Sequence, residues 1–330
     1  MERMIKLRNL DIREAGLEYL PEGVRNWKSL QTLSNFIVSS ATEGCKIEEL
    51  KHHNLLQDCV KIEWVGDLKS VEQAAEARLQ AKSQLTELEL DFYFGEEIVL
   101  ASTPEALEEK RLMESVLGVL QPHSNLKKFT ISEYSGFKFP SWMGDTITAA
   151  QGWEVWEFAN GEIQVGVMMP RVTSINIHNC PNLIAFPALN KLPSLKKLKI
   201  EYADKLTSIS REFYCNGCNT LLFPKLVDLD IGNMKNLEVL VLGAITDGEK
   251  VDTSSDIGIL PGLKSLTIHG CPVLKSLRFL TKSVPSLEEI PWWTLKEFKF
   301  RGDEQEEEEE ADLSLLPRLL NLDFLDSEEE

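Results

Sequence analysis

The spacing of apolar residues in the stretch LKSLTIHGCPVLKSL is the feature that most constrains the fold. The apolar positions follow the order L-x-x-L-x-L-x-x-C-x-V, at Leu263, Leu266, Ile268, Cys271 and Val273. An amphipathic helix repeats its apolar residues every three to four positions and a half-buried strand every two, so this order fits neither period throughout. It favours a short strand at Leu266 and Ile268, followed by a turn near Cys271. One such unit cannot bury its own apolar face, so the pattern requires neighbouring copies.

Copies of this order are present along the whole chain. They start at Leu7, Leu85, Leu126, Val172, Leu195, Leu226, Leu295 and Leu319. The order is the template of a leucine-rich repeat, whose usual period is about 20 to 29 residues. Here the starts from Val172 onward lie 23, 31, 37, 32 and 24 residues apart, and the wider gaps before Val172 are each expected to hold one or two poorer copies. The sequence therefore predicts an α/β leucine-rich-repeat solenoid with irregular repeats, a curved parallel β-sheet on its concave face, and helices and loops on its convex side.

The length and composition agree with one elongated unit. A chain of 330 residues would ordinarily suggest about two domains, but a repeat array grows one unit at a time, so residues 1–330 are expected to form a single solenoid. Hydrophobic residues make up 43% of the chain, yet no run of 18 apolar residues occurs, so no membrane span is predicted. The amino-terminal segment lacks the apolar stretch of a signal peptide, which predicts a cytoplasmic location.

Three segments between the repeats have their own expected structure. VKIEW at Val60 is a further candidate strand. Residues 71–85 are rich in Ala, Glu, Gln and Lys, which favours a helix on the convex side. A second helix is predicted from Pro104 to Leu120, because Thr103 precedes a proline at the first helical position. The buried stripe of that helix is expected at Leu112, Val116, Leu117 and Leu120.

Several longer segments carry a family resemblance. They are WKSLQTLSNFIVSS at Trp27, HSNLKKFTISEYSGFKFPSWM at His123, WEVWEF at Trp153, INIHNCPNL at Ile175 and LPSLKKLKIEYADKLTSISREFY at Leu192. Over residues 1–277 the chain resembles the repeat region of plant intracellular coiled-coil nucleotide-binding leucine-rich-repeat (NB-LRR) disease-resistance proteins. That resemblance implies a protein-binding module of an innate immune receptor. Its partners would be a pathogen effector, a guarded host protein, and the nucleotide-binding domain of the same or a related receptor, which it would restrain.

The chain also departs from that family. No G-x-x-x-x-G-K-[ST] loop occurs, so no nucleotide-binding domain is present and no cofactor is expected. Between FPSWM and WEVWEF, where the family carries several repeats, only residues 144–152 intervene. The alternative interpretation is a free-standing leucine-rich-repeat scaffold or adaptor that assembles signalling complexes without any switch.

The cysteines and histidines of the chain do not form a recognisable catalytic or metal site. Cys215 and Cys218 have C-x-x-C spacing but no second pair, as a zinc ribbon requires. His178 and His269 each precede a repeat cysteine, and we expect them to stay apart because they belong to different repeats. The repeat cysteines, Cys180 and Cys271, are expected to be buried thiols. With no nucleophile or metal motif present, the sequence predicts no enzyme activity, no catalytic residues and no metal site.

The concave face offers the candidate site. The exposed template positions are mixed to acidic near Glu89 and Asp91, and then change sign. The later basic positions are Lys127, Lys128, Lys196, Lys197, Lys199, Lys264, Lys296, Lys299 and Arg301, against Glu201, Asp228, Asp230 and Glu297. This local excess of five positive charges, in a chain whose net charge is −18, predicts a basic strip that binds an acidic protein surface. The alternative is that these lysines are ordinary solvent-facing strand residues.

Nucleic acid is not an expected partner, since the chain is acidic overall and no aromatic residues alternate with the lysines to stack on bases. Residues 303–312 contain eight acidic residues and no Lys or Arg. Such a block is expected to be a solvated, disordered inter-repeat loop, or to fold back onto the basic strip.

Overall fold

The computed structural model describes residues 4–21, 23–39, 44–93, 103–143, 155–157, 163–165, 169–184, 189, 192–209, 223–242, 260–274, 276–279 and 286–288. Several predictions lie outside these residues. They concern the repeats at Leu295 and Leu319, the C-x-x-C pair Cys215 and Cys218, the acidic block 303–312, and the three basic positions Lys296, Lys299 and Arg301.

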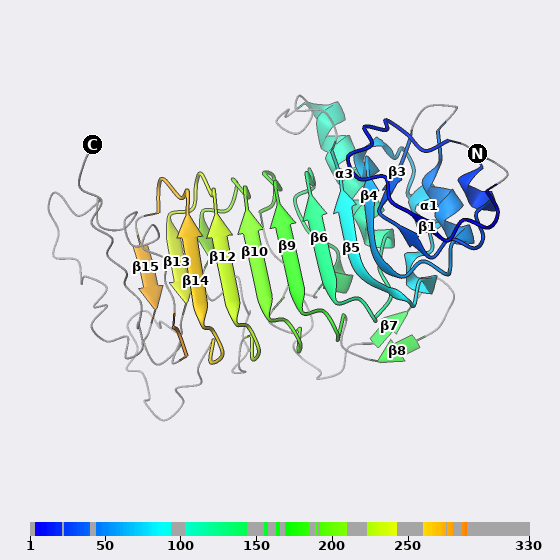
Figure 1. The fold of residues 1–330 in the computed structure, drawn as a ribbon. Helices are drawn as coiled ribbons and strands as arrows, with labels where there is room; N and C mark the ends of the chain where they lie inside the picture. The colour runs from blue at the N-terminus through cyan, green and yellow to red at the C-terminus, as the bar shows by residue number, and fades with distance from the viewer. Residues whose placement is uncertain are drawn as a thin grey trace, which may run out of the picture.

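An eight-stranded parallel sheet organises the molecule (Figure 1). In spatial order its strands are β3 (Asn35–Ile37), β4 (Asp58–Glu63), β5 (Leu85–Asp91), β6 (Lys128–Ser132), β9 (Ser174–His178), β10 (Lys197–Glu201), β12 (Asp228–Gly232) and β14 (Ser265–His269). Each predicted repeat from Leu85 to Leu263 supplies one of these strands, and the VKIEW segment supplies β4. The predicted leucine-rich-repeat solenoid is confirmed.

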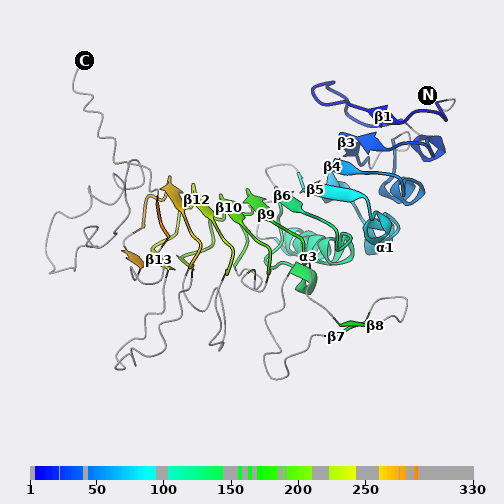
Figure 2. The same cartoon turned by 60° about the horizontal axis from the view of Figure 1, so that its bottom comes forward.

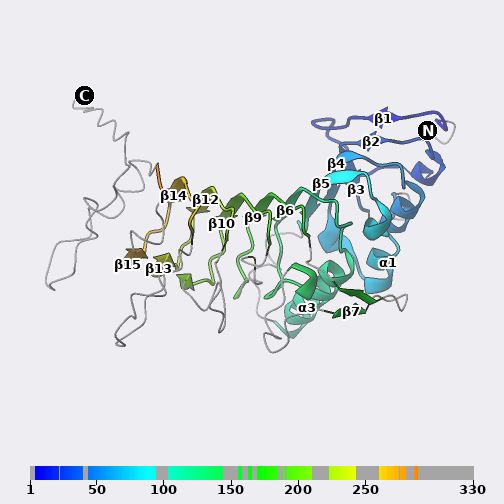
Figure 3. The same cartoon turned by 90° about the horizontal axis from the view of Figure 1, so that it is seen from below.

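The remaining elements surround this sheet. Two-residue strands β1 (Asn9–Leu10) and β2 (Thr32–Leu33) pair in parallel near the amino terminus. Helices α1 (Val71–Ala75) and α3 (Pro104–Val119) lie on the side of the sheet away from its open, concave face (Figures 2 and 3). Short 3₁₀ turns are η1 (Val24–Asn26), η2 (Ile47–His52), η3 (Val65–Asp67), η4 (Leu79–Ala81) and η5 (Ser141–Met143).

Further along the chain, a second parallel sheet takes the place of helices on the convex side. It consists of β11 (Ser208–Ile209), β13 (Val239–Leu242) and β15 (Ser276–Phe279). An antiparallel hairpin of β7 (Val155–Glu157) and β8 (Ile163–Val165) contains part of the WEVWEF segment and stands apart from the main sheet. Among the described residues no helix has both the length and the apolar character that a membrane crossing needs.

Two apolar rows run across the strands and form the core. In register, Leu88 of β5 is followed by Phe129, Ile175, Leu198, Leu229 and Leu266. The second row runs through Leu90, Ile131, Ile177, Ile200, Ile231 and Ile268. All twelve side chains are buried, and each contributes roughly 1.5–3 kcal/mol by leaving water. The repeat cysteines Cys180 and Cys271 are buried as predicted, and burial raises the pKa of Cys180 to about 12.

The sheet corrects one expectation about the wide gaps. The gap after Leu7 does hold further strands, including β3 and β4. However, β5 pairs directly with β6, and β6 pairs directly with β9. The gaps after Leu85 and Leu126 therefore hold no extra strand of this sheet. Their described residues include α3 and the β7–β8 hairpin. Segments without the apolar spacing of the repeat have no side chains that continue the apolar rows, so they do not join the sheet.

The convex helices also differ in part from the prediction. The Thr103 hydroxyl accepts a hydrogen bond from the Ala106 amide at 3.3 Å, as expected of a cap, but Met113 rather than Leu112 is fully buried. The helix predicted over 71–85 is wrong beyond Ala75, because Arg78 adopts a left-handed conformation (φ 51°) that ends it.

A tryptophan of the FPSWM segment closes the end of α3. The indole Nε1 of Trp142 donates a hydrogen bond to the carbonyl of Leu117 at 3.1 Å, and its ring lies edge to face with Phe129, with centroids 5.8 Å apart. The same carbonyl accepts a hydrogen bond from the Leu120 amide at 3.2 Å, so the indole adds a second donor at the end of the helix. The motif therefore ties the convex helix to the core.

A left-handed residue follows most strands of the main sheet. Positive φ angles occur at Trp64, Glu133, Asn179, Tyr202, Asn233 and Gly270, each directly after a strand. Residues other than glycine are sterically disfavoured in this conformation, so we infer that packing against the next repeat stabilises the sharp turn there. The Asn179 amide, for example, donates to the carbonyl of Glu201, which extends the ladder one residue past the strand. These residues form a rim along one edge of the concave face.

A buried histidine gives the fold a dependence on pH. His53 is 1% exposed, and burial, together with the Lys82 ammonium, lowers its pKa to about 4. The unfolded chain binds this proton at an ordinary pKa of 6.5, whereas the folded chain does not. Stability is therefore unaffected above pH 6.5 and is lost as pH falls toward 4.

We expect acidification from pH 7 to pH 5 to lower the free energy of unfolding by about 2 kcal/mol through His53 alone. Urea denaturation at both pH values measures this, and His53→Leu should remove that part of the pH dependence. His52→Gln is the control, because His52 is the exposed neighbour. Equal pH dependence in wild type and His53→Leu would contradict the assignment.

Candidate functional site

The basic strip begins as a row just before the strands. Lys127, Thr173, Lys196, Val227 and Lys264 occupy equivalent positions, and each of the last four donates its amide to the carbonyl of the residue before it in this row, at 2.8–2.9 Å. The three lysines are exposed. We call Lys127, Lys196 and Lys264 the lysine row. They alternate with uncharged residues across the sheet, so the predicted lysines are brought together along one edge.

The lysines farther along the strands lie beside carboxylates. Lys128 contacts Glu87 of β5 at 2.7 Å, and Lys197 contacts Asp228 of β12 at 2.7 Å. Lys199 lies 3.0 Å from Glu201 and 3.5 Å from Asp230.

Within the lysine row, Lys264 lies 3.0 Å from Glu288. Lys127 and Lys196 have no ion pair within the described part of the chain. Acidic and basic side chains therefore alternate in the interior of the strip. Among its described lysines, Lys127 and Lys196 are the two without an ion pair.

A carboxylate on β10 contacts both repeat histidines. His178 Nδ1 and His269 Nε2 each lie 3.4 Å from a different oxygen of Glu201. The two histidines lie on different strands, β9 and β14, as expected, and the contact that they share with Glu201 was not predicted. The strand between β10 and β14 carries Gly232 at this level, and the absence of a side chain there leaves room for the His269 ring to reach across.

Glu201 stays charged in this setting. Burial raises its pKa, but the Lys199 ammonium and His178 outweigh burial and leave the pKa of Glu201 below its ordinary value. The same contact with Glu201 and Asp230 overcomes burial at Lys199, whose pKa is raised. In the described residues, no group of three or more His, Cys, Asp or Glu side chains is arranged to hold a metal ion. The cluster therefore links side chains of neighbouring repeats through polar contacts.

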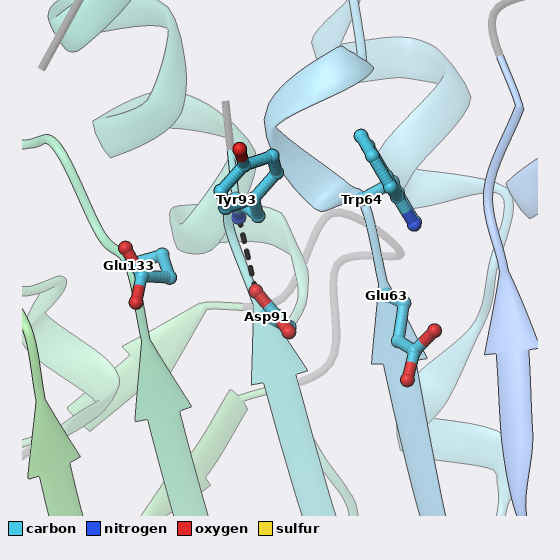
Figure 4. Close-up of a pocket in the computed structure, with 5 residues that line it drawn as sticks. All are labelled: Glu63, Trp64, Asp91, Tyr93 and Glu133. Carbon is cyan, nitrogen blue, oxygen red and sulfur yellow. Dashed lines mark hydrogen bonds between the residues drawn. The ribbon is translucent and has the colours of Figure 1, made fainter. Parts of the chain in front are cut away.

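At the carboxyl ends of the strands, opposite the lysine row, lies a hollow that the sequence analysis missed. It has a volume of about 460 Å³ and is lined by Glu63, Trp64, Asp91, Tyr93 and Glu133, which we call the acidic rim pocket (Figure 4). These residues come from the ends of the adjacent strands β4, β5 and β6. Only Asp91 was among the concave positions considered, because the repeat template ends before the rim. The acidic character of the early positions was the available signal.

Comparison with known proteins identifies repeat proteins to which this chain is similar. The family model described as R13L1/DRL21 LRRs matches residues 47–203. RPP13-like protein 1 of Arabidopsis thaliana is 29% identical over 81% of this chain and 23% of its own length. Disease resistance protein RGA2 of Solanum bulbocastanum is 26% identical over 76% of this chain and 22% of its own. The chain is similar to the leucine-rich-repeat regions of plant disease-resistance proteins. The resemblance seen in the sequence is confirmed.

The relatives are much longer than this chain. Another Arabidopsis thaliana protein named for disease resistance is 27% identical over 80% of the chain but only 16% of its own length. The chain thus spans about a fifth of these relatives. Among solved structures, the leucine-rich repeat domain of the type III effector XopL is similar at 18% identity, with a TM-score of 0.35 over 73% of this chain and 70% of that one.

The histidine contact depends on Gly232, which gives a testable consequence. A Cβ at this position would overlap the His269 ring, so we expect Gly232→Ala to lower the free energy of unfolding by about 1–3 kcal/mol. In a His269→Ala background the obstacle is gone, and the same change should be neutral or stabilising by up to about 1 kcal/mol. Urea denaturation of the four variants measures the difference. Equal effects of Gly232→Ala in both backgrounds would contradict this arrangement.

Proposed function

We propose that this chain is the protein-binding module of a plant disease-resistance protein, and that its concave face recognises a pathogen effector or a guarded host protein. The observation that carries the proposal is the open sheet face, on which Lys127 and Lys196 lie without a carboxylate partner in the described residues. Leucine-rich repeats typically act as protein-interaction modules, and their concave face is the extended surface used for binding. The relatives named for disease resistance supply the biological setting.

The partner of this face is proposed to be an acidic protein surface. Lys127 and Lys196 lie in one row and are separated by Thr173, so they lie roughly 10 Å apart given the strand spacing. Two carboxylates with similar spacing would match them. Positive charge grouped on an otherwise acidic chain steers an acidic partner to this edge and repels other approaches.

The proposed role in signalling is restraint of a nucleotide-binding domain. In the resting state that domain would occupy the concave face. An effector or guarded protein that binds the same lysines would then displace it. Such a ligand shifts the equilibrium only by the difference between its affinities for the two states, so competition for one surface is a sufficient mechanism.

The test is a pull-down from plant cell extract with the full chain. We expect Lys127→Glu/Lys196→Glu to lose at least about tenfold of the captured partner, and raising salt from 0.05 M to 0.5 M to weaken capture by wild type. Circular dichroism verifies that both chains fold, which these exposed positions should permit.

Lys197→Glu/Lys199→Glu provides the comparison within the strip, because these lysines already contact Asp228, Glu201 and Asp230. Lys235→Glu is the control for reversing the charge of one exposed lysine away from the lysine row. Equal capture by Lys127→Glu/Lys196→Glu and by wild type would place recognition elsewhere on the solenoid.

A further inference from the structure

We infer that the acidic rim pocket binds an arginine side chain of a partner protein, between the exposed rings of Trp64 and Tyr93 and the carboxylates of Glu63, Asp91 and Glu133. This inference rests on the proposed protein-binding function and deepens it, since it names the chemistry of a second contact. The residues that line the pocket lie at the carboxyl ends of β4, β5 and β6 (Figure 4), whereas Lys196 and Lys264 precede β10 and β14, which lie farther along the sheet (Figure 1).

Two large aromatic side chains remain exposed at this pocket. Trp64 is 37% exposed and Tyr93 42%, and their rings meet edge to face with centroids 5.2 Å apart. Trp64 occupies the left-handed rim position (φ 62°) after β4, so the turn between repeats holds the indole out of the core. The Tyr93 amide donates to Asp91 Oδ1 at 3.0 Å, which holds the loop after β5. Exposed aromatic surface of this kind is typical of binding hot spots.

The surrounding charges select a cation. Three carboxylates line the pocket, and among the described residues Lys61 lies 3.0 Å from Asp91 and 3.7 Å from Glu63. Glu63, Glu89 and Asp91 together with Lys61 leave a formal excess of two negative charges. Lys61 also contacts Glu89 at 3.1 Å, so its single charge is divided among several acids. A cationic ligand therefore meets an attractive field at the aromatic rings.

Hydrogen bonds hold two of the lining carboxylates in place. Glu63 Oε1 accepts from the side-chain Nδ2 of Asn35 at 2.6 Å, and Glu133 Oε2 accepts from the side-chain Nδ2 of Asn179 at 2.6 Å. Both donors are neutral and come from neighbouring strands or turns, so they orient the carboxylates without neutralising them. The carboxylates are therefore positioned before a ligand arrives, which reduces the entropy lost on binding.

Arginine fits this combination better than lysine. A guanidinium is planar, stacks on an aromatic face and donates two parallel hydrogen bonds to a carboxylate. Contact with an aromatic face contributes roughly 0.5–2 kcal/mol, most strongly with tryptophan. An ammonium is a compact, strongly hydrated charge that gains less from the rings.

The test uses the full chain labelled with 5-fluorotryptophan and the blocked peptide Gly-Arg-Gly. The chain has seven tryptophans, and Trp64→Phe identifies the resonance of Trp64. We expect the peptide to shift this resonance to saturation and to leave the others unchanged. Gly-citrulline-Gly, a neutral peptide of nearly the same shape, should produce no shift, and Gly-Lys-Gly should bind at least about threefold more weakly.

Asp91→Asn/Glu133→Gln should weaken Gly-Arg-Gly binding at least about tenfold, because it removes two charges and keeps the side-chain shapes. Glu105→Gln/Glu108→Gln on the exposed surface of α3 is the control with the same loss of charge and should bind as wild type. No shift at Trp64, or equal binding of the citrulline peptide, would overturn the inference, and equal binding of Gly-Lys-Gly would overturn its preference for arginine.

The readout at Trp64 does not involve the lysine row. A failed titration therefore overturns the arginine pocket and leaves the pull-down result for Lys127 and Lys196 standing. Conversely, a pull-down that does not depend on those lysines leaves the titration at Trp64 as an independent result.

Discussion

The structure depends on apolar rows that no single repeat can complete. Leu88 and Leu90 lie in two rows that continue through five further strands, so each strand is covered on its inner face only because its neighbours are present. This mutual burial explains why each repeat from Leu85 to Leu263 supplies one strand of the main sheet. It also explains the strain at the strand ends, where residues such as Glu133 and Tyr202 adopt left-handed conformations so that the next repeat stays in register.

The buried apolar rows fix the backbone of the strands. The side chains on the open face of the sheet are then free to vary in charge. On the open face this freedom produces cross-strand ion pairs in the middle of the strip, with Lys197 beside Asp228 and Lys199 between Glu201 and Asp230. Partly exposed pairs of this kind contribute little to stability, typically below about 1 kcal/mol each. Among the described residues these pairs neutralise most of the lysines of the strip, whereas Lys127 and Lys196 have no ion pair there, and the proposed recognition depends on this difference. At the other end Lys61 divides one charge among several acids, and the surface there is acidic.

A concave surface with a basic lysine row and an acidic rim pocket is complementary to a partner that carries acidic groups in one region and an arginine in another. The lysine row would contact acidic groups, and the acidic rim pocket would contact an arginine, so one partner bridging both must present the two charges in a defined order. Complementarity of this kind sets orientation and excludes incorrect partners more effectively than it raises affinity. It also fits a surface for which a resting partner and a recognised partner would compete.

Sequence alone determined the fold, because the repeat spacing is a local pattern with one stable solution, and the strands at Leu85, Leu126 and Leu263 follow from it. It also determined the cap at Thr103 and the buried thiols Cys180 and Cys271, which depend on positions within one repeat. Tertiary structure alone decided which charges meet, since His178, Glu201 and His269 converge only through the register of four strands and the absence of a side chain at Gly232. The acidic rim pocket likewise arises where the ends of β4, β5 and β6 lie side by side, and the residues that line it are up to 70 positions apart in the chain. The repeat spacing fixes each strand separately, whereas a site built across strands requires their registers together.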